Sequence, residues 1–281
     1  MLSSGVLGVI FALASAVSWG TGDFSGGVAT RSRSQFQTLF LMTLPGILIL
    51  SLISFLIGEP IPAWKDVLWS STAGLLGAVG IASLYRGLSI GNAAAVAPAA
   101  AVIGAALPVA FSALFIGVPG ALRLGGFLAA MAGIWLVSRT NGSSAFSDRR
   151  GLWYAVLAGI GFGVFFVFIA QVRHGLVFAP LVFAKSSALM FAVVIMLVRR
   201  EGVPSLMSSP VAVLAGVFDA GGNAFYMLAR QFTRLDVAAV LASMYPAVTV
   251  ILSCLILKEQ VSASQWRGVL LCIFAIALIS M

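Results

Sequence analysis

Long apolar segments alternate with short polar breaks along the whole chain. With a window of about 19 residues, ten apolar segments stand out, near residues 4–26, 35–57, 67–88, 92–116, 120–138, 151–172, 176–198, 211–231, 236–257 and 262–281. The breaks carry charges and turn residues, as in Gly58-Glu59-Pro60 and Arg200-Glu201-Gly202. Because about 20 apolar residues in a helix cross the hydrocarbon core of a bilayer, the pattern predicts ten transmembrane helices.

The longest polar break, residues 139–150, lies at the midpoint of the chain. We interpret it as a linker between a first repeat at 1–138 and a second at 151–281. A shift of 141 residues aligns Tyr85 with Tyr226 and several small or apolar residues with one another, which is moderate evidence for duplication. Because each half has an odd number of helices, the second half must be inverted in the membrane relative to the first.

Composition agrees with a membrane protein. Of the 281 residues, 61% are hydrophobic and 9% are charged, and the mean hydropathy is +1.11, which leaves no room for a separate soluble domain. The net charge of +8 arises almost entirely in the breaks. No basic run with interleaved aromatics occurs, so we expect no nucleic-acid partner. Cys254 and Cys272 lie in apolar segments without partners of metal-site spacing, so neither a disulfide framework nor a metal or other cofactor is expected.

Several motifs resemble the EamA-type transporters of the drug/metabolite transporter superfamily. They are WGTGDFSGG at 19–27, LYRGL at 84–88 and VAP at 96–98 in the first half, and FDAGGNAFY at 218–226, SMYPAVTV at 243–250 and LKEQ at 257–260 in the second. The resemblance covers essentially the whole chain. It implies an all-α integral membrane carrier of ten helices, in two inverted five-helix repeats around a central cavity. Members export amino acids and other small metabolites, or move sugars and drugs.

The chain departs from the family pattern at one place. The Glu that usually follows the ninth helix is present as Glu259, but the first half has Gly117-Val118 at the equivalent position. A role that needs a symmetric pair of these acids is therefore not expected.

Ionisable residues inside apolar segments are the first candidates for function, because a charge in hydrocarbon is costly. Lys185 lies deep in the seventh segment and could bind a substrate carboxylate, balance an acid or snorkel. Asp219 and Asp23 are candidates for binding a substrate ammonium or for proton coupling. The structural alternatives are a hydrogen bond from Asn223 to Asp219 and a helix-capping role for Asp23. His174, in a connection, is a weaker candidate for proton coupling.

Aromatic residues form the second set of candidates. The family resemblance places the first, third, sixth, eighth and ninth helices around the cavity, where aromatic rings can pack on a substrate and offer a hydrogen bond. The predicted substrate-binding residues are therefore Trp19, Tyr85, Phe165, Phe166, Lys185, Asp219, Asn223, Tyr226 and Tyr245.

The favoured interpretation is a secondary-active transporter that exports amino acids, with aromatic or large neutral ones preferred, by alternating access. Sugar, nucleotide-sugar or drug transport on the same fold is the alternative. A structural scaffold is a further reading, and an intramembrane aspartyl protease is a remote one, suggested by the GTGD string at 20–23 and by Phe218-Asp219. We expect the protein to bind a small-molecule substrate, to contact membrane lipid and to be a monomer. The expected location is the inner membrane of a bacterium. Lys and Arg are more numerous in the connections on the side away from the termini, which by the positive-inside rule predicts termini outside the cytoplasm. The family resemblance predicts termini inside it.

Overall fold

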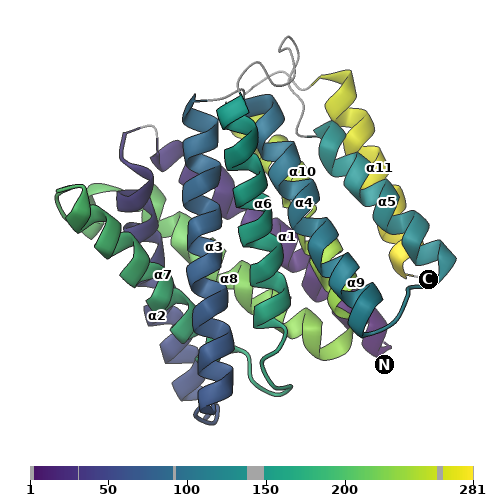
Figure 1. Cartoon of the computed structure of the whole chain (residues 1–281), viewed down its shortest axis with the longest axis horizontal. Coiled ribbons are helices and arrows are strands. Elements are labelled where there is room, and N and C mark those ends of the chain that lie inside the picture. Colours follow the sequence, from purple (N-terminus) through teal and green to yellow (C-terminus); the bar gives the residue numbers. More distant parts are fainter. Residues whose placement is uncertain (1–2, 31, 91–92, 138–148, 258–261, 281) are drawn as a thin grey trace.

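The computed structural model describes residues 3–30, 32–90, 93–137, 149–257 and 262–280, which are helical apart from short connections (Figure 1). The first half contributes α1 (Ser4–Ala29), α2 (Gln35–Leu56), α3 (Trp64–Ile90), α4 (Ala93–Phe115) and α5 (Ala121–Val137). The second half contributes α6 (Arg149–Ile169), α7 (Phe178–Val198), the short η1 (Leu206–Ser208), α8 (Pro210–Phe232), α9 (Leu235–Ala242), α10 (Tyr245–Leu257) and α11 (Ala263–Ser280).

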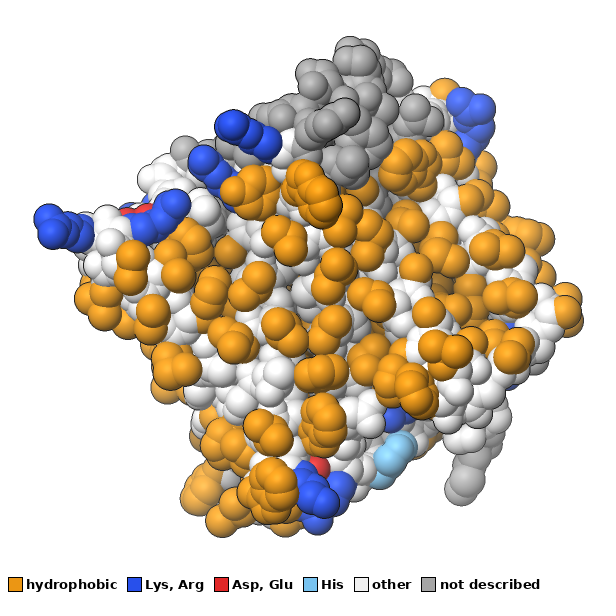
Figure 2. Space-filling model, in the orientation of Figure 1, with side chains coloured by type: hydrophobic (Ala, Val, Ile, Leu, Met, Phe, Trp, Pro, Cys, Tyr) orange, Lys and Arg blue, Asp and Glu red, His pale blue; other side chains and the backbone are white. Residues whose placement is uncertain are grey.

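These helices confirm the prediction of an integral membrane protein with ten spans. Within the described residues, six segments are long and apolar enough to cross a membrane, and four shorter apolar helices supply the remaining spans. Hydrophobic side chains cover the middle of the face seen in Figure 2, while Lys, Arg and His gather toward its upper and lower edges. We call the side of the bundle where α1 begins and α11 ends the terminal face, and the other side the opposite face.

The ninth span differs from the single helix predicted over 236–257, because it is broken between α9 and α10. Pro246 has no amide hydrogen to donate to the carbonyl of Ala242. The chain around the break forms tighter bonds instead, from the Met244 amide to the Leu241 carbonyl at 3.2 Å and from the Ala247 amide to the Met244 carbonyl at 3.0 Å. The equivalent span of the first repeat, α4, is continuous.

Helix packing follows the symmetry expected of inverted repeats. α1 packs along α8, and its counterpart α6 packs along α3. The second helices of the two repeats, α2 and α7, pack on each other, as do the last helices, α5 and α11 (Figure 1). α4 packs on α6, while its counterpart, α9 with α10, packs on α1. This pairing places the first four spans of each repeat around a common centre.

Two matching backbone contacts fix the register of the repeats. A Cβ atom added to Gly74 would lie 1.9 Å from the carbonyl oxygen of Ala184, and one added to Gly216 would lie 2.1 Å from that of Met42. Residue numbers 74 and 216 differ by 142, as do 42 and 184. Both glycines therefore allow the same helix crossing, once in each half.

This register corrects the single shift of 141 residues predicted from the sequence. Gly20 in α1 and Gly163 in α6 are equivalent positions. A Cβ added to Gly20 would lie 2.6 Å from the Cβ of Val248 in α10, and one added to Gly163 would lie 2.6 Å from the Cβ of Leu107 in α4. The shift is thus 143 at α1 and α6, 142 at α2, α3, α7 and α8, and 141 only at α4 and α10. The sequence pairing of Tyr85 with Tyr226 is consequently one residue out of register.

The ends of α2 and α7 form the same turn. In α2, the amides of Ile57, Gly58 and Glu59 donate to carbonyls three to five residues earlier, at 3.0, 3.1 and 3.0 Å. In α7, the amides of residues 199–201 make the same bonds at 2.9, 3.1 and 2.9 Å. The turn requires a left-handed residue, which is Gly58 with φ of 65° and Arg200 with φ of 56°.

Each turn presents a glutamate to the start of the other helix of the pair. The carboxylate of Glu59 accepts from the amides of Val177 at 2.5 Å, Phe178 at 3.0 Å and Ala179 at 2.5 Å, and so caps α7, which has no side-chain cap of its own. Glu201 accepts from the hydroxyl of Ser34, the N-cap residue of α2. The helix dipole favours both negative charges.

We expect Gly216→Ala to destabilise the protein strongly, because the added methyl group would overlap the backbone of Met42. Gly125→Ala in α5 is the matched control, since a Cβ there meets open space. Thermal unfolding in detergent should show a large fall in midpoint for Gly216→Ala and no fall for Gly125→Ala. Equal midpoints would contradict the described crossing.

Glu59→Gln should lower stability by about 1 kcal/mol, because the side chain keeps its size but loses the charge that caps α7. Glu201→Gln is the comparison, and its effect should be smaller because α2 retains the capping box of Ser34 and Gln37. Denaturation of the two variants in parallel measures the difference. A larger loss for Glu201→Gln would show that the Glu59 cap contributes little.

Candidate functional site

A cavity lies in the middle of the bundle, between α1, α2, α3, α4, α6, α7 and α8 and beside the break between α9 and α10. Its lining reaches Asp23 toward the end of α1, Leu39 near the start of α2 and Leu84 toward the end of α3. All three helix ends belong to the opposite face. The cavity therefore extends from the centre of the membrane-spanning region toward that face.

The lining combines aromatic, polar and small residues. The aromatic members are Trp19, Phe162, Phe165, Phe166 and Tyr245, and the polar ones are Asp23, Thr43, Lys185, Asp219, Asn223 and Ser243. Small and aliphatic residues, such as Gly74, Gly77, Ala101 and Gly104, complete the wall.

Lys185 and Asp219 form an ion pair that joins α7 to α8 at the cavity wall. Their side chains are 10% and 15% exposed, so little solvent screens the two charges. Of the roles predicted for Lys185, the structure shows the balancing of a nearby acid. The ammonium group does not snorkel to either face, because its partner lies beside the cavity.

Asn223 holds Asp219 from one helical turn further along α8. Its amide nitrogen donates to Oδ1 of Asp219 at 3.1 Å and to the backbone carbonyl of the same residue at 2.6 Å. Asp219 thus has one carboxylate oxygen on Lys185 and the other on Asn223. The predicted bond between Asp219 and Asn223 is present, and it coexists with a position on the cavity wall.

Asp23 also lines the cavity. The alternative that it caps or ends the first helix is wrong, because α1 continues to Ala29. Among the described residues it has no ion-pair partner, in contrast to Asp219. The cavity therefore contains one paired and one unpaired carboxylate.

The aromatic wall is built on Trp19. Its indole lies against Gly222 of α8, where an added Cβ would be 2.4 Å from Cδ1 of the ring. The centroids of Phe166 and Phe165 lie 5.5 and 6.4 Å from that of Trp19. These spacings are typical of aromatic pairs, so three of the predicted aromatic residues form one continuous surface.

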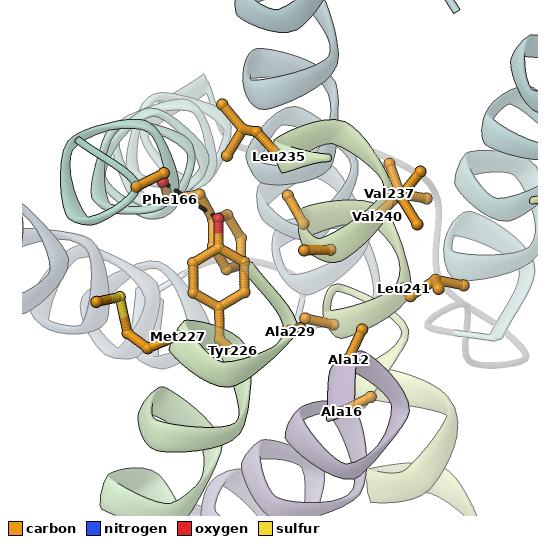
Figure 3. Packing of buried hydrophobic residues seen from close by; sticks show 14 of the residues in the cluster. Ala12, Ala16, Phe166, Tyr226, Met227, Ala229, Leu235, Val237, Val240 and Leu241 are labelled. Atoms are coloured by element: carbon orange, nitrogen blue, oxygen red, sulfur yellow. Dashed lines mark hydrogen bonds between the residues drawn. The ribbon is translucent and has the colours of Figure 1, made fainter. Parts of the chain in front are cut away.

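Tyr226 belongs to a second layer behind this surface. It is fully buried, packs 4.8 Å from the Phe166 ring, and donates its hydroxyl hydrogen to the Phe166 carbonyl at 3.2 Å (Figure 3). The direct substrate contact expected for Tyr226 is thereby replaced by a supporting role. Tyr245, in contrast, lines the cavity at the start of α10.

The remaining predicted residues are placed as follows. Tyr85 is part of α3, but its side chain lies outside the described residues. His174 is exposed in the connection between α6 and α7, on the terminal face, away from the cavity. Glu259 and most of the linker at 139–150 lie outside the described residues.

Sequence reasoning missed Thr43, Phe162 and Ser243, which line the cavity. Thr43 is the position equivalent to Lys185 at the shift of 142, so the corrected register would have identified it. Ser243 lies at the helix break, and the following Tyr-Pro pair was its signal. Phe162 is the position equivalent to Trp19 at the shift of 143, so the corrected register would have identified it as well.

Toward the terminal face the bundle is closed by packed side chains. All eight residues of α9 are buried, and its apolar side chains belong to one cluster with Tyr226 and with Ala12 and Ala16 of α1 (Figure 3). Arg230 of α8 adds a polar contact, since its guanidinium donates to the carbonyl of Ala170, directly after the end of α6, at 3.0 Å. The cavity is therefore sealed from the terminal face by several layers.

Comparison with known proteins shows the class to which this architecture belongs. The model of the EamA-like transporter family matches residues 6–139 and again residues 149–281. The chain belongs to this family, and it is a membrane transporter of small substrates. The family resemblance seen in the sequence is thus confirmed.

Solved structures support the fold. One crystal structure of a protein superposes with a TM-score of 0.74, covering 96% of this chain and 95% of that chain at 19% sequence identity. No curated protein shows a significant sequence match to the chain.

The protease reading does not agree with this site. An aspartyl protease requires two carboxylates that share a proton, whereas Asp219 is bound by Lys185 and Asn223. The family to which the chain belongs consists of transporters, which also argues against the interpretation as a purely structural membrane scaffold.

Gly222→Ala should displace the Trp19 ring from the wall, because the new methyl group would overlap the indole. In a variant that keeps only Trp19 among the tryptophans, we expect stronger acrylamide quenching after this substitution. Gly27→Ala, on the same helix as Trp19 and facing open space, is the control. Unchanged quenching in Gly222→Ala would contradict the described wall.

Proposed function

We propose that this protein is a secondary-active transporter that exports amino acids, with aromatic or large neutral ones preferred, by alternating access. The observation that carries the proposal is one cavity that combines an aromatic wall with charges of both signs. An amino acid offers matching chemistry, namely a carboxylate, an ammonium group and an apolar side chain.

Each group of the substrate has a complementary residue. Lys185 is the cation for the carboxylate, and Asp219 is the anion for the ammonium group, with Asn223 as a hydrogen-bonding neighbour. Trp19, Phe165 and Phe166 provide a surface for an aromatic or large neutral side chain. Asp23 supplies a further carboxylate for proton coupling.

Alternating access is supported by the shape of the site. The cavity extends toward the opposite face, while α9 and the second aromatic layer close the terminal face. In the proposed cycle, the symmetric counterpart of this arrangement opens the terminal face. The inner membrane of a bacterium is the location proposed together with this function.

Counterflow in proteoliposomes tests the substrate. We expect labelled tryptophan to exchange faster than threonine, and glucose not to exchange. Tryptophan methyl ester and indole-3-propionate, which each lack one of the two charges, should compete at least about tenfold less well than tryptophan, because a lost charged contact is worth about 1.4 kcal/mol or more. Exchange of glucose without any amino acid would make the proposed substrate class wrong and favour sugar transport.

A further inference from the structure

The positions of the ion pair in α7 and α8 have neutral counterparts in α2 and α3 of the first repeat. At the shift of 142 set by Gly74 with Gly216 and by Met42 with Ala184, Lys185 corresponds to Thr43 and Asp219 corresponds to Gly77. Thr43 and Gly77 also line the cavity. The first repeat thus builds this region with no charge at either position.

This difference shows that the fold does not require the ion pair. A buried pair gains little or nothing over neutral residues, because the desolvation of two charges offsets their attraction. The neutral arrangement is already present in the first repeat. The pair in the second repeat is therefore an addition whose role lies in the cavity rather than in packing.

The cavity wall places the pair where a substrate could come between its charges. The stem of Lys185 passes α2, with Cδ 3.8 Å from the position of a Cβ added to Gly46. Asp219 keeps one oxygen on Asn223 when the other is released. Both charges thus remain supported by the protein if they separate.

We propose that the Lys185–Asp219 pair cancels its own charge in the empty transporter and so allows the empty transporter to reorient, while a zwitterion separates the pair when it binds. The proposal rests on the proposed function for the nature of the substrate. In the loaded state, the carboxylate faces Lys185 and the ammonium group faces Asp219. The two residues therefore add no uncompensated charge to either state, and such a charge would be costly to carry through the membrane centre.

This arrangement makes a specific prediction about net transport. A transporter whose empty form reorients can move substrate down a gradient without a return substrate. A transporter in which one of the two charges is left without its partner returns slowly when empty, and this slow return limits net efflux. The rate of net efflux therefore reports on the pair.

The test is a double-mutant cycle with Asp219→Asn, Lys185→Met and the combined variant in proteoliposomes loaded with labelled tryptophan. Each single variant should show net efflux and exchange both slowed by at least about tenfold, because a bound zwitterion leaves the uncompensated charge in place. The combined variant has no charge at either position, so its net efflux should return toward that of the wild type despite weaker binding. Midpoints of thermal unfolding, lowered in the single variants and recovered in the combined one, provide a readout that needs no substrate.

Two results would overturn the proposal. They are an unchanged rate of net efflux in folded single variants, and a rate in the combined variant that is no higher than in the single ones. If the wild type exchanges glucose and no amino acid, the proposed substrate class fails separately. Net efflux is then measured with glucose, and the same comparison decides whether the pair controls the return of the empty transporter.

Discussion

A charge inside the hydrocarbon must be met by a partner within the protein, and the Lys185–Asp219 pair meets that demand at the centre of this bundle. The position of the pair depends on α7 and α8. Glu59 caps the start of α7, and the contact of Gly216 with Met42 sets the depth at which α8 crosses α2. Asn223 then orients the carboxylate. The position of the two charges thus depends on the Glu59 cap and on the crossing of α2 and α8, both of which lie outside the cavity.

Close helix approach is the second condition for the site. The hydroxyls of Ser15 and Ser18 in α1 donate to the carbonyls of Gly222 and Phe218 in α8, each at 2.7 Å. The hydroxyl of Thr249 joins α10 to the Gly20 carbonyl at 3.0 Å. In a lipid environment, where apolar packing alone gives little preference for protein partners, such bonds and small residues hold helices together. They hold α1 against α8, where the Trp19 ring lies on Gly222.

The spans could be predicted from the sequence because hydropathy over about 20 residues is a direct consequence of membrane thickness. Lys185 and Asp219 could be selected because polar groups are rare in such segments. The direction in which a side chain points could not be predicted. Tyr226 and Tyr245 cannot be distinguished by their residue type, but Tyr226 lies in a buried layer and Tyr245 lines the cavity. Hydropathy alone did not show the break at Ser243, because its flanking residues are as apolar as those of a continuous helix, and Pro246 was the only local signal.

The two glutamate-bearing turns also limit how α2 and α7 can move. These helices run antiparallel, and each is bonded at its start to the turn that follows the other, by Glu59 at the terminal face and Glu201 at the opposite face. Sliding one helix along the other would separate both carboxylates from their helix starts at once. A change in the angle between the helices would also separate them, because a rotation about a point along the helices displaces the ends most. In mechanical terms, α2 and α7 form a strut pinned at both ends, which favours movement of the two helices as one body.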